Sequence, residues 1–416
     1  MDLVIEGNMF VGGELKQMSV GIEDGRIVTM GKIVRGGEER LEFREKLILP
    51  GFVDPHVHFR DPGLTRKEDF RSGTMSAAYG GVTCVLDMPN TVPPVTDVRR
   101  LREKDATVRS KAFVDYGLFS ALTRNTDVET LAHDSVGFKL FMGSTTGDIL
   151  MNDDVSINNI IRRASATGRV ISVHAEDDNL IGRSPEKNNR DHLRNRPIAA
   201  ELNAIRRLGA YKGAKINICH ITSAGSAAMA GEYGFTTEVT AHHLLFNDYK
   251  EGSQYKVNPP LRDEATREML FKTFRDGKVG MIGSDHAPHT ESEKSDDYGT
   301  APSGIAGVET TVPLLLNMVK KGIIPLGLLV SMASDNPART FGLRKGRIEK
   351  GYDADLAIFD LRDVRKIDGD ALHGKNRTSV YGGCEAIFPE TVIMRGSMLI
   401  SDGELCGSET GENVRG

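Results

Sequence analysis

The sequence predicts an α/β protein: a (β/α)8 barrel of the TIM type with a small β-sandwich domain built from both ends of the chain. Between residues 51 and about 341, apolar strand-like segments alternate with segments of helical periodicity about eight times, as in such a barrel. Both ends instead carry short strand-like segments separated by glycine. We therefore expect the small domain at 1–50 and 343–416, and the barrel at 51–342.

The strands expected in the small domain carry apolar residues at about every second position. Near the N-terminus they lie at 3–7, 18–22 and 26–30, and near the C-terminus at 354–359 and 392–394. We expect the two sets to pair. The last dozen residues are polar and rich in glycine, so the sequence predicts that they are frayed.

One unit of the barrel shows the strand–helix alternation well. Residues 137–142 form an apolar strand, and apolar residues then recur at helical spacing between 157 and 164, behind the capping candidates Asp153 and Asp154. Gly168 ends this helix. A doubly wound open sheet is the alternative, but no GxGxxG or Walker loop opens a predicted helix. The other barrel strands are expected at 52–54, 82–86, 112–114, 170–173, 216–219, 237–240 and 279–282.

The composition limits the class of protein. Lys and Arg number 53 against 58 Asp and Glu, a net charge of -5, and no basic run indicates a nucleic-acid binder. No segment approaches the roughly 18 apolar residues that span a bilayer, and the N-terminus lacks a secretion signal. The cysteines form no CxxC pair and indicate reduced thiols: Cys84, Cys219, Cys384 and Cys406. We therefore expect a cytoplasmic protein with no nucleic-acid or membrane partner.

Polar residues at the ends of predicted strands indicate a metal centre, because a barrel has its active site at the carboxyl ends of its strands. His56 and His58 end the first strand, and His174, His220 and Asp285 end later ones. Buried ionisable groups are costly unless they are paired or bind a metal. This ligand set suits Zn²⁺ better than Mg²⁺ or Ca²⁺ and is too large for one catalytic zinc. It fits two metal ions with an anionic group between them.

Other polar residues near these strand ends receive different interpretations. His242 and His243 are adjacent, so strand alternation should send them to opposite faces, and His286 should point away from the site. Cys219 should face the helices as a small apolar residue. Lys139 ends the fourth strand, and its ordinary role would be a surface lysine or the partner of a carboxylate. An unmodified ammonium group could not bind a metal ion.

These residues resemble the cyclic amidohydrolase superfamily and, within it, the dihydroorotase family. The resemblance extends from 24–27 through the barrel motifs to 350–356. It implies that Lys139 is an N6-carboxylysine, a carbamate formed with CO₂, whose oxygens bridge two zinc ions. Some members use an aspartate bridge instead, but Asp153 and Asp154 lie farther along, before the helix. The resemblance assigns His56, His58, Lys139 and Asp285 to one zinc ion, and Lys139, His174 and His220 to the other.

Residues beside the metal ligands resemble those that bind the substrate in this family. Arg60, within 58–63, and Asn90 correspond to residues that bind a carboxylate, which a guanidinium can do bidentately. Asn258, within 256–262, corresponds to a residue that contacts the pyrimidine ring, although it could also be a turn residue before two prolines. The resemblance completes the substrate pocket with His58, His289, Ser303 and Gly304.

The resemblance implies reversible cyclisation of N-carbamoyl-L-aspartate to L-dihydroorotate plus water in pyrimidine biosynthesis. A water between two zinc ions can be hydroxide near neutral pH and attack the ring carbonyl. Asp285 is expected to take the proton and pass it to the ring nitrogen, as general base and then acid. In the loop after Lys139, Thr145 or Thr146 is expected to contact bound substrate.

Two other functions remain open. Hydantoinases (dihydropyrimidinases) and allantoinases share the metal ligands but act on cyclic amides that lack this carboxylate, so assays on those substrates discriminate them. An inactive homologue that serves as a scaffold is disfavoured, because all six metal-binding positions are filled. We expect a small-molecule substrate and allow for a homodimer.

Overall fold

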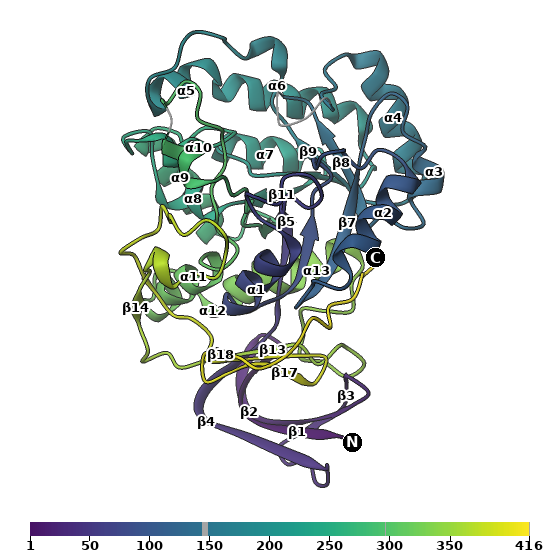
Figure 1. The fold of residues 1–416 in the computed structure, drawn as a ribbon, viewed down its shortest axis with the longest axis vertical. Helices are drawn as coiled ribbons and strands as arrows, with labels where there is room; N and C mark the ends of the chain where they lie inside the picture. Colours follow the sequence, from purple (N-terminus) through teal and green to yellow (C-terminus); the bar gives the residue numbers. More distant parts are fainter. Residues whose placement is uncertain (144–148, 296, 416) are drawn as a thin grey trace.

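The structure is a computed structural model that describes residues 1–143, 149–295 and 297–415. Within these residues, eight parallel strands form the barrel sheet in the order of the sequence, and helices lie outside them (Figure 1). The strands are β5 (Phe52–Val57), β6 (Val82–Asp87), β7 (Asp115–Ala121), β8 (Gly137–Phe141), β9 (Ile171–His174), β10 (Ile216–Ile218), β11 (Thr236–Val239) and β12 (Met281–Ile282).

The first and last barrel strands meet just beyond β12, where Val57 and His286 form a parallel bridge. The His58 amide donates to the His286 carbonyl at 2.8 Å. Asp54 also joins the two ends, because its Oδ1 accepts from the amides of His56 and Ser284, each at 3.1 Å. The barrel is thus nearly closed, which confirms the predicted fold class.

The helices begin where the sequence offers capping side chains. Asp69, Asp97, Asp153 and Asp263 each accept a hydrogen bond from an amide in the first turn of the following helix. The α-helices among the described residues are α1 (Phe70–Tyr79), α2 (Val98–Val108), α3 (Val128–Leu131), α4 (Asp154–Ala166), α5 (Asn189–Asn195), α6 (Ile198–Leu208), α7 (Ala224–Glu232), α8 (Ala241–Leu245), α9 (Glu264–Arg275), α10 (Glu291–Ser295), α11 (Thr311–Lys320), α12 (Leu326–Val330) and α13 (Asn336–Phe341).

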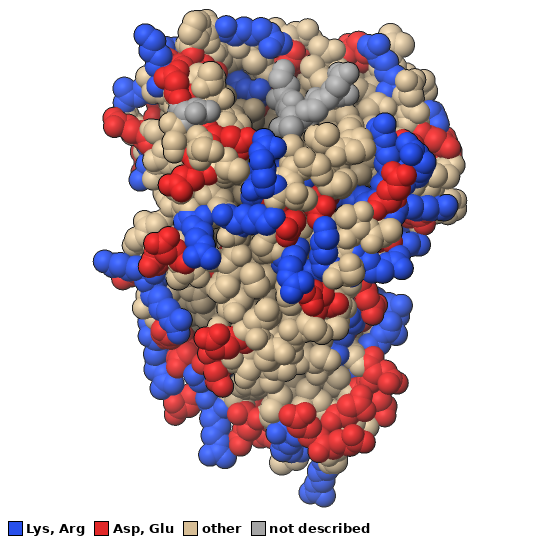
Figure 2. Space-filling view, viewed as in Figure 1, with Lys and Arg blue, Asp and Glu red and all other residues tan. Residues whose placement is uncertain are grey.

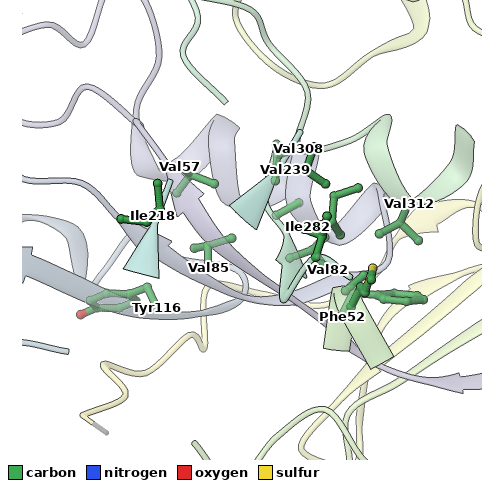
Figure 3. Packing of buried hydrophobic residues seen from close by; sticks show 14 of the residues in the cluster. Phe52, Val57, Val82, Val85, Tyr116, Ile218, Val239, Ile282, Val308 and Val312 are labelled. Carbon is green, nitrogen blue, oxygen red and sulfur yellow. The ribbon is translucent and has the colours of Figure 1, made fainter. Parts of the chain in front are cut away.

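The main apolar core lies between the barrel strands and the surrounding helices. Figure 3 shows Val57, Val85, Ile218 and Val239 packing in this cluster with residues of the neighbouring segments. Val312, on α11, belongs to the same cluster. This core holds the carboxyl ends of the strands, and therefore the functional side chains, in fixed relative positions.

The small β domain combines both ends of the chain, as predicted. Among the described residues its eight strands form one sheet in the order β18-β17-β16-β13-β4-β1-β2-β3. In β4, Leu47 and Leu49 pack in the main core whereas Ile48 packs in a second core, because neighbouring strand residues face opposite sides. The strands are β1 (Leu3–Val11), β2 (Glu14–Glu23), β3 (Arg26–Gly31), β4 (Glu39–Pro50), β13 (Leu356–Phe359), β16 (Thr391–Met394), β17 (Ser397–Ser401) and β18 (Glu404–Leu405), and β14 (Arg365–Lys366) pairs separately with β15 (Glu385–Ala386).

Two sequence predictions, one about the third barrel strand and one about the C-terminal segment, were wrong. The third barrel strand lies at Asp115–Ala121 and not at 112–114. The C-terminal segment is not frayed, because it pairs with β7: the Tyr116 amide donates to the Glu412 carbonyl at 2.9 Å, and the Val414 amide donates to the Tyr116 carbonyl at 2.7 Å. Backbone pairing thus holds a segment whose composition alone favours disorder.

The distribution of charge on the surface and the lengths of the helices can be compared with the sequence. On the face shown in Figure 2, Lys and Arg side chains are interspersed with Asp and Glu, as the small net charge predicts. None of the described helices is both long and apolar enough to cross a membrane. Thr145 and Thr146, the predicted substrate contacts, lie outside the described residues.

Candidate metal centre and active site

A cavity of about 320 Å³ lies at the carboxyl ends of the barrel strands. Its lining includes the six predicted metal ligands and most of the predicted substrate contacts: His56, His58, Arg60, Asn90, Lys139, His174, His220, Asn258, Asp285, Ser303 and Gly304. The structure therefore brings together residues from β5, β8 and β9 and from the segments that follow β6, β10, β11 and β12. His289 does not line the cavity, but its ring nitrogen lies 3.4 Å from an Arg60 nitrogen.

One group of ligand atoms gathers around Asp285. Its Oδ1 lies 3.4 Å from His56 Nε2 and 3.1 Å from His58 Nε2. Lys139 Nζ lies 3.3 Å from the same Nε2 of His56. Burial would raise the pKa of the Asp285 carboxyl, but His56 and His58 hold it well below its usual range. Asp285 is therefore an ionised carboxylate beside two ring nitrogens.

A second pair of ligand atoms lies in the same cavity, where His174 Nδ1 and His220 Nε2 are 3.1 Å apart. Burial lowers the pKa of both histidines, so both rings are neutral near pH 7 and at most one proton lies between the two nitrogens. Two lone-pair donors that converge in this way suit a shared divalent metal. The described donor set thus fits metal ions of the zinc class at both groups.

Three of the predicted metal-ligand histidines, His56, His58 and His174, have a partner on their other ring nitrogen. His56 Nδ1 lies 2.7 Å from Glu238 Oε1, and His58 Nδ1 lies 2.6 Å from Asn90 Oδ1. His174 Nε2 lies 2.8 Å from Glu176 Oε2. Such partners fix the tautomer and the orientation of a ligating imidazole. For His220 no partner of Nδ1 is found among the described residues.

The two carboxylates in this set, Glu176 and Glu238, were missed by the sequence analysis. Both are fully buried. Burial opposes the charge of Glu176, but Arg196 and His174 lower its pKa to about 2. The available signals were weak: Glu176 follows His174 by two residues, and Glu238 is a lone acid within a short strand.

Replacing Glu238 by glutamine should weaken metal binding without removing a ligand. The amide can still contact His56 but no longer supplies a negative charge, so we expect metal affinity to fall about 10- to 100-fold. Competition with a chelator measures this affinity. Glu232→Gln, at an exposed position on α7, is the matched control and should bind metal like the unmodified protein. Equal affinities for both variants would contradict the orienting role of Glu238.

Three site residues adopt a left-handed backbone conformation that is uncommon outside glycine: Arg60 has φ +63°, His220 +37° and Asp285 +46°. All three line the cavity. These residues therefore lie on irregular backbone just beyond the strand ends. Strained backbone conformations of this kind are often found in active sites.

This irregular backbone explains one wrong prediction. Cys219 was expected to face the helices, by alternation with His220. However, β10 ends at Ile218, and the sulfur of Cys219 lies 3.0 Å from Lys139 Nζ. Strand alternation does not apply after the strand has ended.

The histidines that were set aside do not line the cavity. His242 and His243 lie on the short helix α8 and not on a strand, with their rings 4.5 Å apart, so the reason given for excluding them was wrong. His243 contacts Thr240 Oγ1 at 2.7 Å through Nδ1. His286 accepts from the Gly307 amide at 3.2 Å and points away, as predicted.

A group of cationic and neutral side chains gathers around Arg60, which lines the cavity. Arg60 is only 3% exposed, and its Nε donates to the Pro288 carbonyl at 3.3 Å. His289 lies between Arg60 and Lys67, whose Nζ is 3.0 Å from His289 Nδ1. Burial, Arg60 and Lys67 together lower the pKa of His289 to about 2, so it is a neutral hydrogen-bonding group. The part of the cavity beside Arg60 suits an anionic group on a ligand.

Asn258, which lines the same cavity as Arg60, is held by neighbouring side chains. In the amide orientation that satisfies both of its polar atoms, the nitrogen donates to Ser303 Oγ at 3.2 Å. The oxygen accepts from Arg196 at 3.3 Å. Gly304 follows with φ +151°, and a Cβ there would lie 2.3 Å from the Ala287 carbonyl oxygen, so only glycine fits.

A barrel whose strand ends carry histidines, an aspartate and a buried lysine around one cavity defines a class of metal-dependent hydrolases. The model of the Amidohydrolase family matches residues 47–396, and the chain belongs to this family. A relative named dihydroorotase from Thermoplasma acidophilum is 39% identical over 96% of this chain and 95% of its own length. A dihydroorotase from Pyrococcus furiosus is 36% identical over 100% of this chain and 96% of its own.

Solved structures agree with this fold. An L-hydantoinase (dihydropyrimidinase) from Arthrobacter aurescens superposes with a TM-score of 0.92 at 25% identity, covering 99% of this chain and 98% of that chain. A D-hydantoinase from Thermus sp. has a TM-score of 0.91 at 23% identity with the same coverage, and it supports the fold alone. The family and its relatives make the chain a hydrolase of cyclic amides.

Proposed function

We propose that this chain is a dihydroorotase, which closes N-carbamoyl-L-aspartate to L-dihydroorotate and water, reversibly, in pyrimidine biosynthesis. The observation that carries the proposal is the buried guanidinium of Arg60, in the same cavity as the histidine cluster. Dihydroorotate bears a ring carboxylate, and a guanidinium matches a carboxylate in charge and shape. Relatives named dihydroorotase, similar over nearly the whole chain, support the same substrate.

The proposed cofactor is a pair of zinc ions. His56, His58 and Asp285 would hold one ion, His174 and His220 the other. Lys139, as N6-carboxylysine, would contribute to both, and its Nζ near His56 supports this assignment. When bound, such ions polarise a carbonyl group and lower the pKa of a water molecule.

The residues of the chain then have separate tasks in the reaction. Arg60, Asn90 and the neutral His289 hold the substrate carboxylate, which orients the reacting carbonyl. Asp285, kept ionised by His56 and His58, takes the proton of the attacking water and delivers it to the ring nitrogen. In ring closure the same carboxylate takes the proton from nitrogen. Asn258 and the segment at Ser303 and Gly304 contact the ring.

Metal analysis combined with a ring-opening assay on dihydroorotate tests the proposal. We expect two zinc ions per chain and activity in the unmodified protein, and loss of both the second ion and activity in Lys139→Ala. Lys321→Ala, at a position 50% exposed, is the control and should behave like the unmodified protein. An active Lys139→Ala variant with two ions would remove Lys139 as the bridge, and an inactive unmodified protein with full metal would contradict the dihydroorotase function.

A second candidate is hydrolysis of a cyclic amide without the carboxylate, as the solved hydantoinase structures suggest. Hydantoin, dihydrouracil and allantoin should be assayed beside dihydroorotate. A larger kcat/KM for any of them would favour this alternative. The cytoplasmic location and the homodimer stay predictions.

Replacing Arg60 by glutamine should raise the KM for dihydroorotate more than it lowers kcat. The buried guanidinium binds the carboxylate in the ground state and the transition state alike, so its loss costs uniform binding. We expect KM to rise roughly 10- to 100-fold, the value of a charge-assisted hydrogen bond. Arg66→Gln, at a position 62% exposed, is the control and should leave both constants unchanged. A fall confined to kcat would place Arg60 in the chemical step instead.

A further inference from the structure

Cys219 and Lys139 make a close contact that the reaction scheme does not use. The sulfur lies 3.0 Å from Lys139 Nζ, and the exposed fractions are 2% for Cys219 and 0% for Lys139. Lys139 lies on β8 and Cys219 directly after β10, so the contact spans the strand β9 between them. His56 Nε2 lies 3.3 Å from the same Nζ. The lysine nitrogen is thus held between a ring nitrogen of the metal site and a thiol.

We infer that Cys219 is a positioning residue for the carboxylated form of Lys139, an inference that rests on the proposed function. In carboxylation the uncharged amine attacks the carbon of CO₂, and an N–C bond forms. One C=O π pair moves to oxygen, and one amine proton leaves to water. The product, Lys–NH–COO⁻, keeps a single hydrogen on Nζ. The Cys219 sulfur accepts the hydrogen bond from that hydrogen.

This contact fixes the direction in which the carbamate oxygens point. A carbamate is planar by the same resonance that flattens a peptide bond, so its N–H lies in the plane of the two oxygens. Rotation about the Cε–Nζ bond would otherwise turn this plane freely. A single acceptor on the N–H would restrict that rotation and hold the carbamate plane in one orientation.

A thiol suits this position better than the other buried acceptors nearby. A carboxylate such as Glu238 would attract the ammonium form of Lys139, which cannot react with CO₂, and would repel the carbamate once formed. The sulfur of cysteine is a weak, uncharged acceptor and does neither. The same weakness predicts a modest effect on carbamate formation.

The test measures carbamate occupancy directly. The full-length protein is equilibrated with ¹³C-labelled bicarbonate at increasing concentration, and the carbamate carbon is observed by ¹³C NMR in parallel with metal analysis. We expect Cys219→Ala to need roughly fivefold more bicarbonate for half-occupancy, the loss of about one net hydrogen bond. Cys219→Ser keeps an acceptor and should stay near the unmodified protein.

Cys84→Ala is the matched control, because Cys84 is also fully buried but packs in an apolar cluster with Val53 and Leu86. It should not alter the carbamate signal. If the unmodified protein shows a signal and Cys219→Ala shows the same bicarbonate dependence, the role of Cys219 is overturned while the proposed function stands. If both Cys219 variants lose occupancy equally, thiol volume and not hydrogen bonding matters, which also overturns it. If the active, two-metal unmodified protein shows no carbamate, the bridge itself fails.

Discussion

Asp285→Asn should lower kcat by roughly 10²- to 10⁴-fold in both directions of the reaction, the usual contribution of a general base. The amide keeps an oxygen beside His56 and His58 but cannot hold a proton at neutral pH. Ring opening and ring closure use the same proton position, so both rates should fall by the same factor. Steady-state assays in the two directions measure this directly.

Metal content separates the two roles that Asp285 could have. If it is a base as well as a ligand, the asparagine variant should keep a low kcat and a near-normal KM even when added zinc has filled both sites. If it is only a ligand, the variant should lose metal in proportion to activity, and added zinc should restore turnover. Restoration by zinc would therefore contradict the assignment of Asp285 as the proton carrier.

The meeting of the predicted metal ligands in one cavity could be predicted because their positions are encoded locally. Each follows an apolar segment, and a barrel brings the carboxyl ends of its strands to one face. His56, His174 and His220 needed no knowledge of their partners, only of where each strand stops. The same reasoning failed one residue earlier at Cys219, since β10 ends at Ile218 and the following backbone no longer alternates.

Features that depend on distant residues could not be predicted in this way. Glu238 orients His56 across 182 positions of the chain, and nothing in its own strand marks it as a partner. The strand β7 was misplaced because Gly117 and Ser120 interrupt its apolar run. A Cβ at Gly117 would lie 2.8 Å from a Leu86 methyl group and 3.0 Å from Val136 Cβ, so the glycine lets these side chains pack closely over the strand.

A buried cluster of charged residues near the C-terminal segment also depends on residues that are distant in the sequence, and it could not be predicted for the same reason. Lys345 Nζ lies 2.6 Å from Asp115, 2.7 Å from Asp355 and 3.0 Å from Asp353. Arg395, just after β16, also pairs with Asp115. Burial opposes the charge of Lys345, but Asp355 and Asp115 hold its pKa well above its usual range. The cluster therefore joins the start of β7 to the small β domain.

Lys345→Met should destabilise the protein by about 3–5 kcal/mol, because it leaves carboxylates buried without their cation. A methionine fills similar space, so the loss is electrostatic and not a cavity effect. Thermal and urea unfolding measure it. The control is Lys321→Met, which removes a pair with Glu385 of the same 2.7 Å length at positions 50% and 48% exposed and should cost at most about 1 kcal/mol. Equal losses for the two variants would mean that burial of the cluster adds nothing to the stability of the protein.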